Sequence, residues 1–276
     1  MEPLDVLRDD NGLCGRRKRS GTACSIGRNG CGEIQFDIDW TSGMTTPSVA
    51  TGGVVIPEVL DAEVKQMKAT LSQKESWFRN FAGKLHQKLE WRSAVGFPTD
   101  VLVREARGAD LIVVGRSKPQ GDLYSTVNLA GAVLNAGRPV LVVPDGIGTL
   151  RAKHVVIGWK DAREARRAVP DALPFLHEAD SVAIVEIHDT DETGLAQKNI
   201  DDVANFLGRH KIKAGPKITL QRKGSDAGQL LRVAQDAGAD LLVTGAYGHS
   251  RLGEWFFGGV TRELLTSSPI CCLISH

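Results

Sequence analysis

Short apolar runs alternate with helical stripes along the second half of the chain. The runs, such as Leu241-Leu242-Val243, are continuous, which is typical of strands buried on both faces of a sheet. Strands that alternate with helices of this length predict βαβ crossovers and an open parallel sheet covered on both sides. We expect strands over residues 154–159, 181–187, 217–221, 240–244 and 270–274, and helices over 162–177, 195–210, 226–236 and 260–267.

The chain repeats itself at a fixed spacing. Gly108-Ala-Asp-Leu-Ile-Val-Val-Gly115 matches Gly238-Ala-Asp-Leu-Leu-Val-Thr-Gly245, an offset of 130 residues, and the same offset places Pro139 on Pro269. Two separate matches at one spacing indicate a duplicated domain. The predicted fold class is therefore α/β, with two tandem open parallel five-stranded sheets.

The first copy is clear only in its later half. There we expect a helix over 57–87, a strand over 89–94, a helix over 100–107, and strands over 110–114 and 139–143. The offset projects the first strand of the unit onto residues 24–30, whose sequence we do not expect to form a strand. Residues 33–40 alternate well enough for a half-buried strand. The first copy is therefore predicted to be incomplete at its N-terminus.

We divide the chain into three parts on this basis. Residues 1–43 form an atypical N-terminal tract, and whether it is disordered is left open. Residues 44–148 form a degenerate first domain, and residues 149–276 form a second domain with a glycine loop.

Composition narrows the classes of function. Apolar residues make up 42 % of the chain and charged residues 24 %, as in soluble globular proteins. A formal charge of +1 provides no long-range attraction to nucleic acid or acidic membranes. No run is long enough to span a membrane, so we expect a cytoplasmic protein. The five cysteines form no C-x-x-C pair, and Cys271 and Cys272 are expected to be buried strand residues.

A glycine-rich loop follows the predicted strand 240–244. It reads Gly245-Ala-Tyr-Gly-His-Ser-Arg-Leu-Gly-Glu-Trp-Phe-Phe-Gly-Gly259 and leads into the helix over 260–267. Glycines let backbone N–H groups approach a ligand closely, and the start of a helix adds the positive end of its dipole. This pattern favours a phosphate-binding loop.

With the duplication and this loop, the chain resembles a tandem universal stress protein. The ATP-binding members share the pattern G-x2-G-x9-G-(S/T), which Gly245, Gly248 and Gly258 match, while Gly259 stands where Ser or Thr is expected. The resemblance covers about residues 44–276. It implies an adenine-nucleotide-alpha-hydrolase-like fold, a stress-response role, and an adenine nucleotide such as ATP, with Mg, as ligand. It also implies pairing of last strands, which two internal domains can make as a pseudo-dimer, with a homodimer as a further option.

The resemblance also assigns roles to single residues. Gly259 and Val260 would contact phosphate through their backbone, and Thr244 and Ile187 match positions that flank the adenine and ribose. Lys160 stands where the family has an adenine-contacting Asp, and a cation cannot accept that hydrogen bond. Lys160 could instead meet phosphate, or Asp161 could substitute for the Asp. Arg251 either faces the phosphate or is an exposed loop residue. The predicted binding residues are Gly245, Gly248, Gly258, Gly259, Val260, Thr244, Ile187, Lys160, Asp161 and Arg251.

Other patterns point away from further sites. The segment 115–118 lacks the second glycine, so the first domain is expected to be a structural partner of the second. No catalytic constellation can be assembled. Acidic and histidine side chains follow the strand 181–187, but their spacing suits no metal, and we interpret them as solvated strand-end residues. These are Glu186, His188, Asp189, Asp191 and Glu192.

Three functions remain open at this point. The leading one is a cytoplasmic, non-enzymatic stress-response protein whose second domain binds an adenine nucleotide. The second is slow nucleotide hydrolysis, with Arg251 or Lys160 stabilising phosphoryl charge and Asp161 or His249 as the base. The third is a ligand-free scaffold or interaction module, suggested by the departures at Lys160 and Gly259.

Overall fold

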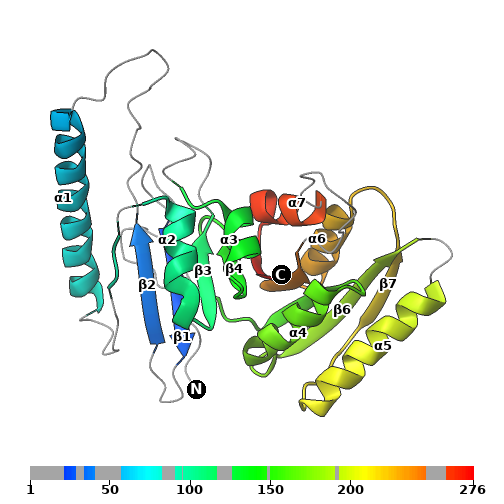
Figure 1. The fold of residues 1–276 in the computed structure, drawn as a ribbon. Coiled ribbons are helices and arrows are strands. Elements are labelled where there is room, and N and C mark those ends of the chain that lie inside the picture. Colours follow the sequence, from blue (N-terminus) through cyan, green and yellow to red (C-terminus); the bar gives the residue numbers. More distant parts are fainter. Residues whose placement is uncertain are drawn as a thin grey trace.

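One continuous nine-stranded sheet runs through the molecule in the order β2-β1-β3-β4-β9-β8-β5-β6-β7 (Figure 1). The computed structural model describes residues 22–28, 34–40, 57–82, 91–94, 96–116, 126–147, 150–189, 193–246 and 259–276. The strands are β1 (Thr22–Arg28), β2 (Ile34–Trp40), β3 (Leu111–Gly115), β4 (Val140–Val143), β5 (His154–Trp159), β6 (Ser181–His188), β7 (Lys217–Gln221), β8 (Leu241–Gly245) and β9 (Cys271–Ser275).

The second half of the chain has the predicted α/β architecture. Its five strands pair in parallel in the order β7-β6-β5-β8-β9, as βαβ crossovers require. The connecting helices are α4 (Arg163–Leu176), α5 (Thr193–Arg209), α6 (Asp226–Asp236) and α7 (Gly259–Ser267). Each lies within a few residues of its predicted range, so the nine elements expected after residue 150 are confirmed.

Two apolar layers cover the two faces of the sheet. Alternate residues of one strand point to opposite faces, so Ile157 of β5 packs with α4 and α5, whereas Val156 packs with α6 and α7. Both residues are about 1 % exposed. Burial on both faces explains why these strands are continuous apolar runs in the sequence.

The last strands of the two halves pair with each other. β4 and β9 run antiparallel, with Leu141 opposite Leu273 and Val142 opposite Cys272. The pairing confirms the expected covering of the last-strand edge. These hydrogen bonds join both halves into one continuous sheet.

The later part of the first half repeats elements of the second. α2 (Pro98–Glu105) leads through a short 3₁₀ turn (Ala106–Gly108) into β3, and α3 (Leu129–Asn135) precedes β4. α3 was not expected, although the offset of 130 projects the start of α7 onto its first residue. Asn128 caps the N-terminus of α3, because its carboxamide oxygen accepts a hydrogen bond from the Gly131 amide at 3.0 Å.

Two expectations for the first half are wrong. Residues 91–94 form no strand, although a strand was expected over 89–94. Residues 24–28 do belong to a strand, β1, which pairs antiparallel with β3 and with β2. β1 thus holds the place next to β3 that β5 holds next to β8.

The register of β1 and β2 explains why this tract can form strands. Cys24 lies opposite Ile38, and Ile26 lies opposite Phe36, so the alternating apolar positions of the two strands coincide. The strand predicted over 33–40 is confirmed as β2. Residues 24–30 lack the continuous apolar run of a buried parallel strand, because polar residues and glycines alternate with the apolar ones.

A long helix, α1 (Pro57–Ala82), lies at the end of the molecule that β1 and β2 form (Figure 1). Its Phe78 is buried, and the ring packs 5.4 Å from the ring of Trp91. None of the helices in the described segments is both long and apolar enough to cross a bilayer.

The cysteines of β9 are structural. Cys271 and Cys272 are buried in the sheet as reduced cysteines, as expected. Burial raises the pKa of the Cys272 thiol to about 11, an effect that outweighs the opposing influence of Ser268 and Arg116. A thiol with such a pKa is a weak nucleophile at neutral pH.

Candidate functional site

The predicted binding residues gather at the carboxyl ends of the parallel strands. Thr244 of β8 is the register partner of Gly158 in β5, and Lys160 and Asp161 follow β5 directly. Ile187 lies near the end of the adjacent strand β6. This edge is where open α/β sheets bind ligands. Of the ten predicted residues, Gly248, Gly258 and Arg251 lie outside the described segments.

Gly245, at the end of β8, is a glycine for a packing reason. A Cβ at this position would lie 2.5 Å from the carbonyl carbon of Glu164 and 2.9 Å from its Cβ. The first turn of α4 therefore occupies the space beside Gly245. The absence of a side chain at Gly245 thus allows the backbone of α4 to come close, whereas the contact of this glycine with a ligand stays a prediction.

The same turn of α4 brings a buried carboxylate to this end of the sheet. Glu164 is only 4 % exposed, and its Oε1 accepts a hydrogen bond from Arg163 Nε at 2.5 Å. Burial raises the pKa of this carboxyl, but hydrogen bonds from Arg163 and its own backbone, with the charges of Arg163 and His276, outweigh burial and lower it. Glu164 is thus held as an anion close to the predicted phosphate loop.

Gly259 opens helix α7 on the far side of the loop. It is exposed, and a Cβ placed on it would meet no atom of the described chain within 4 Å. The adjacent Val260 is partly buried and packs against the α6–α7 core. Among the described residues, therefore, none fills the space beside the first residue of α7, the kind of helix end that can receive an anion.

Lys160 and Asp161 are both exposed, and Asp161 already has a partner. The Asp161 Oδ1 accepts hydrogen bonds from Arg166 at 2.6 Å and 3.1 Å. The Lys160 carbonyl accepts a hydrogen bond from the Ala162 amide at 2.7 Å, which closes the turn into α4. A ligand that used Asp161 as its acceptor would compete with Arg166.

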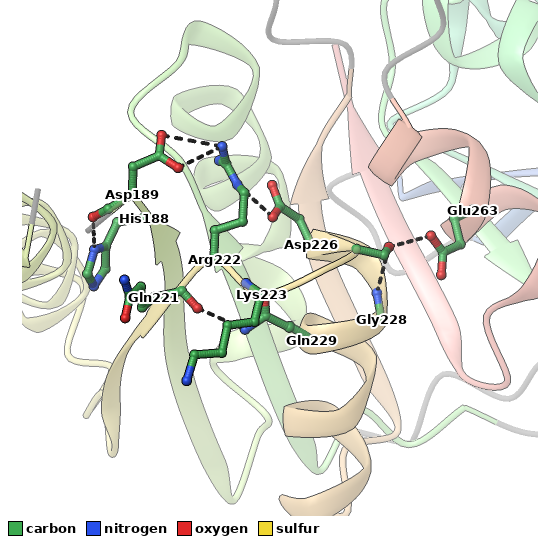
Figure 2. A network of polar contacts seen from close by, with 10 residues as sticks. His188, Asp189, Gln221, Arg222, Lys223, Asp226, Gly228, Gln229 and Glu263 are labelled. Carbon is green, nitrogen blue, oxygen red and sulfur yellow. Dashed lines mark hydrogen bonds and ion pairs between the residues drawn. The ribbon is translucent and has the colours of Figure 1, made fainter. Parts of the chain in front are cut away.

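A polar network lies beyond these residues, at the ends of β6 and β7 (Figure 2). Arg222 bridges two carboxylates: it donates to Asp189 at 3.0 Å and to Asp226 at 2.9 Å. Gln229 fixes the intervening turn, because its Oε1 accepts from the Lys223 amide and its Nε2 donates to the Gln221 carbonyl. The network fastens the β7–α6 turn to the end of β6.

Ser225 links this turn to helix α7. As the N-cap of α6, its hydroxyl oxygen accepts from the Gly228 amide at 3.2 Å, and the hydroxyl donates to Glu263 Oε2 at 2.6 Å. Ser225 was not among the predicted residues, although a Ser directly before a helix with periodic apolar positions is a known start signal.

The strand-end residues whose side chains could ligate a metal make other contacts instead. Asp189 is exposed and forms an ion pair with Arg222. Glu186 and His188, in contrast, are only 7 % and 5 % exposed. The interpretation of these two as solvated was wrong, because both lie in β6 on the side covered by α5; Asn199 donates to Glu186 Oε1 at 3.1 Å. The described segments contain no group of three or more His, Cys, Asp or Glu placed to hold a metal ion.

Comparison with known proteins agrees with this architecture. Residues 151–276 match the model of the universal stress protein family. A universal stress protein of Synechocystis sp. is 26 % identical over 185 residues, a match that covers 63 % of this chain and 61 % of the relative. The chain thus spans less than two thirds of the length of that curated relative.

Solved structures extend the likeness of fold to most of the chain. A universal stress protein from Archaeoglobus fulgidus superposes with a TM-score of 0.67 at 13 % identity, covering 88 % of each chain. A Pseudomonas aeruginosa protein of unknown function gives a TM-score of 0.54 at 13 % identity, covering 74 % of this chain and 77 % of that one. Residues 151–276 are thus similar in sequence to the universal stress protein domain, and most of the chain is similar in fold to proteins that carry it.

Proposed function

We propose that this stress-response protein binds an adenine nucleotide, such as ATP with Mg, at the carboxyl end of β8. In this proposal the glycine loop between Gly245 and Gly259 holds the phosphates. Residues 44–148 act as the structural partner of the binding domain, residues 149–276, and the protein works in the cytoplasm. The observation that carries the proposal is that helix α7 begins at Gly259, directly after the loop, with no described residue within 4 Å of a Cβ placed there.

The remaining predicted residues surround the same edge of the sheet. Thr244 and Ile187 lie near the ends of β8 and β6, the two strands that flank β5, where a base and ribose would reach the sheet. Lys160 in the turn after β5 supplies a positive charge suited to phosphate rather than to adenine. The Asp161 carboxylate is paired with Arg166, which offsets the repulsion that its charge would exert on a phosphate.

Thermal unfolding with nucleotide tests the proposal directly. A ligand that binds only the folded state at about one hundred times its dissociation constant stabilises the protein by roughly 2.7 kcal/mol. We expect Mg-ATP to raise the melting temperature and a nucleotide to be released from the purified protein on denaturation. Unchanged melting with ATP, ADP and AMP would reject nucleotide binding.

A second candidate function is a ligand-free scaffold, and one observation favours it. The backbone of α4 fills the space beside Gly245, and the Glu164 anion lies next to it, where it would repel phosphate. If this is the function, no nucleotide alters the unfolding transition. Removing the anion with Glu164→Gln would then not produce nucleotide binding either, which separates a scaffold from a weakened nucleotide site.

A further inference from the structure

Strand β7 lies at an edge of the sheet, at the end opposite α1 (Figure 1). Among the described strands it pairs only with β6. The Ile184 amide of β6 donates to the Pro216 carbonyl just before β7. Successive strand residues direct their backbone groups to opposite edges, so Thr219, three residues further on, directs its N–H and C=O away from β6. No described strand pairs with these two groups.

The centre of β7 is suited to pairing. Its three central residues, Ile218, Thr219 and Leu220, carry no charge. Edge strands are commonly protected from pairing by a lysine or proline within the strand, and these three positions have neither. Ile218 and Leu220 pack against the apolar layer that includes α6, yet both are only half-buried. A further strand beside β7 would cover them with its own apolar side chains.

Positive charge flanks this uncharged centre. Between Asp202 and Asp226 the sequence contains no Asp or Glu. The Lys and Arg residues of the same interval are Arg209, Lys211, Lys213, Lys217, Arg222 and Lys223.

Three of these lysines are not balanced by an acidic partner. Lys217 and Arg222 already form ion pairs with carboxylates. Lys211, Lys213 and Lys223 are exposed, and no carboxylate of the described segments pairs with them. In Figure 2 the Lys223 side chain points away from the Arg222 network. Unbalanced positive charge therefore lies both just before β7 and just after it.

These charges disfavour pairing of β7 with a second copy of itself. An antiparallel pair centred on Thr219 would bring Lys213 of one copy towards Lys223 of the other at both ends of the pair. Like charges in such positions are destabilising. An acidic segment, in contrast, would meet charge of the opposite sign at both ends.

A nucleic acid is a poorer match for this surface. Proteins bind single strands by stacking bases on aromatic rings. The ring at this end of α5, Phe206, already has two neighbours: Arg209 Cζ lies 5.7 Å from its centroid, and the His210 ring lies 4.6 Å away. An extended polypeptide can use the outward backbone groups of β7, as peptides do at other sheet edges.

We propose that the β7 edge binds an extended acidic segment of a partner protein, which pairs with β7 through its backbone. The segment has apolar side chains opposite Ile218 and Leu220 and acidic residues at both ends, near Lys213 and Lys223. Five strand residues span about 16 Å at roughly 3.3 Å each, so a segment of about nine residues reaches both ends. The proposal requires no nucleotide, so it is independent of the proposed function.

A suitable probe is the fluorescein-labelled peptide Glu-Asp-Thr-Val-Thr-Val-Thr-Asp-Glu, which reads the same in both directions and so suits either strand direction. Its binding to the full-length protein is measured by fluorescence anisotropy. One control peptide has Pro in place of the central Thr, which removes a backbone donor. A second control has Lys in place of every acidic residue. We expect saturable binding of the acidic peptide alone.

Substitution of the lysines tests the role of charge. Lys213→Gln and Lys223→Gln should each weaken binding of the acidic peptide about two- to fivefold, the range for an exposed ion pair. The matched control is Lys68→Gln, an exposed lysine of α1 at the other end of the molecule, which should leave binding unchanged (Figure 1). Lys213→Glu combined with Lys223→Glu should reverse the preference, so that the basic peptide binds and the acidic one does not.

Thr219→Pro tests the role of the backbone. The Thr219 N–H points away from β6, so proline removes no hydrogen bond between β6 and β7, and the fold should be retained. Urea unfolding checks this, and binding of the acidic peptide should be lost. If the variant does not fold, the proline-containing peptide with the wild-type protein tests the same backbone pairing.

Several results would overturn the proposal. They are the absence of saturable binding, equal binding of the acidic and proline-containing peptides, and equal effects of the Lys68 and Lys213 substitutions. Sedimentation of the protein alone tests the second copy: a dimer that Thr219→Pro abolishes would assign the edge to self-association. A single-stranded oligonucleotide that binds more tightly than the acidic peptide, and is weakened by the same lysine variants, would assign the surface to nucleic acid.

Discussion

The backbone of Glu164 lies so close to Gly245 that no side chain fits between them. A Cβ on Gly245 would be 2.5 Å from the Glu164 carbonyl carbon. Both groups belong to rigid elements, β8 and the first turn of α4, so neither can move away without displacing the other. The final glycine of β8 therefore sets how near α4 comes to the sheet.

Replacing Gly245 by alanine should destabilise the protein by about 3 kcal/mol, at the upper end for overpacking, because the clash is with backbone. The measurement is the shift of the urea unfolding midpoint. The matched control is Gly115→Ala, at the equivalent end of β3. A Cβ there meets nothing within 4 Å of the described chain, and the change should stay within about 0.5 kcal/mol. Equal effects at both positions would contradict the packing role of Gly245.

Ser225→Ala should destabilise the protein by about 1 kcal/mol, because α6 loses the side-chain oxygen that caps its first turn. Ser225→Asp keeps a capping oxygen but places a second carboxylate beside Glu263, so Glu263→Gln should improve the stability of that variant. Chemical denaturation measures all three. Ser267 is the control, because its exposed hydroxyl donates only to a carbonyl of its own helix. Ser267→Ala should have little effect on the free energy of unfolding.

Gly259→Ser should strengthen nucleotide binding. The hydroxyl restores the group that the family pattern places here, and one added hydrogen bond of about 1 kcal/mol corresponds to roughly fivefold in affinity. The fold should tolerate the change, since a Cβ at Gly259 meets no atom of the described segments within 4 Å. Equilibrium titration with ATP measures the affinity. Gly194→Ser, on α5, is the control and should leave it unchanged. Affinity that does not rise in Gly259→Ser would favour the scaffold function.

Glu164→Gln should reduce the change in the free energy of unfolding as the pH is lowered. Because the pKa of Glu164 is lowered in the folded state, its carboxylate stabilises the fold above the unfolded pKa of about 4.3. That contribution is lost as the pH falls through the lower, folded pKa. At neutral pH the variant should be less stable by about 1 kcal/mol, since the partner Arg163 is largely exposed.

The measurement is the free energy of unfolding between about pH 7 and pH 3. The difference between wild type and Glu164→Gln should shrink towards the acid end of that range. Glu178→Gln changes an exposed carboxyl at the end of α4 and is the control. A constant difference at every pH would show that the variant acts through packing instead of charge.

The sequence predicted the second half of the fold well because its signals are local. Runs such as Leu241-Leu242-Val243 report burial on both faces directly, and the helices carry clear apolar stripes. α3 was missed because its sequence, Leu-Ala-Gly-Ala-Val-Leu-Asn, has no polar face to give a stripe. β1 was missed because a strand is stabilised by its neighbours, and its neighbours lie in β2 and in the distant β3.

The candidate site was predictable to the extent that parallel strands end at one edge. That rule places Thr244, Ile187 and Lys160 together without knowledge of any side chain. The packing of α4 on Gly245, the pairing of Asp161 with Arg166 and the buried indole of Trp159 depend on how helices lie on the sheet. No spacing along the chain reports such relationships.

The antiparallel pairing of β4 with β9 joins the edges of two half-sheets that belong to the same polypeptide. A tether turns such an association into an intramolecular step, so dilution does not separate the two halves as it would separate two subunits. The outermost strands of the assembled sheet are then β2 and β7, and β7 begins with Lys217 and ends with Gln221. Any larger assembly built by strand addition would have to start from one of these two borders.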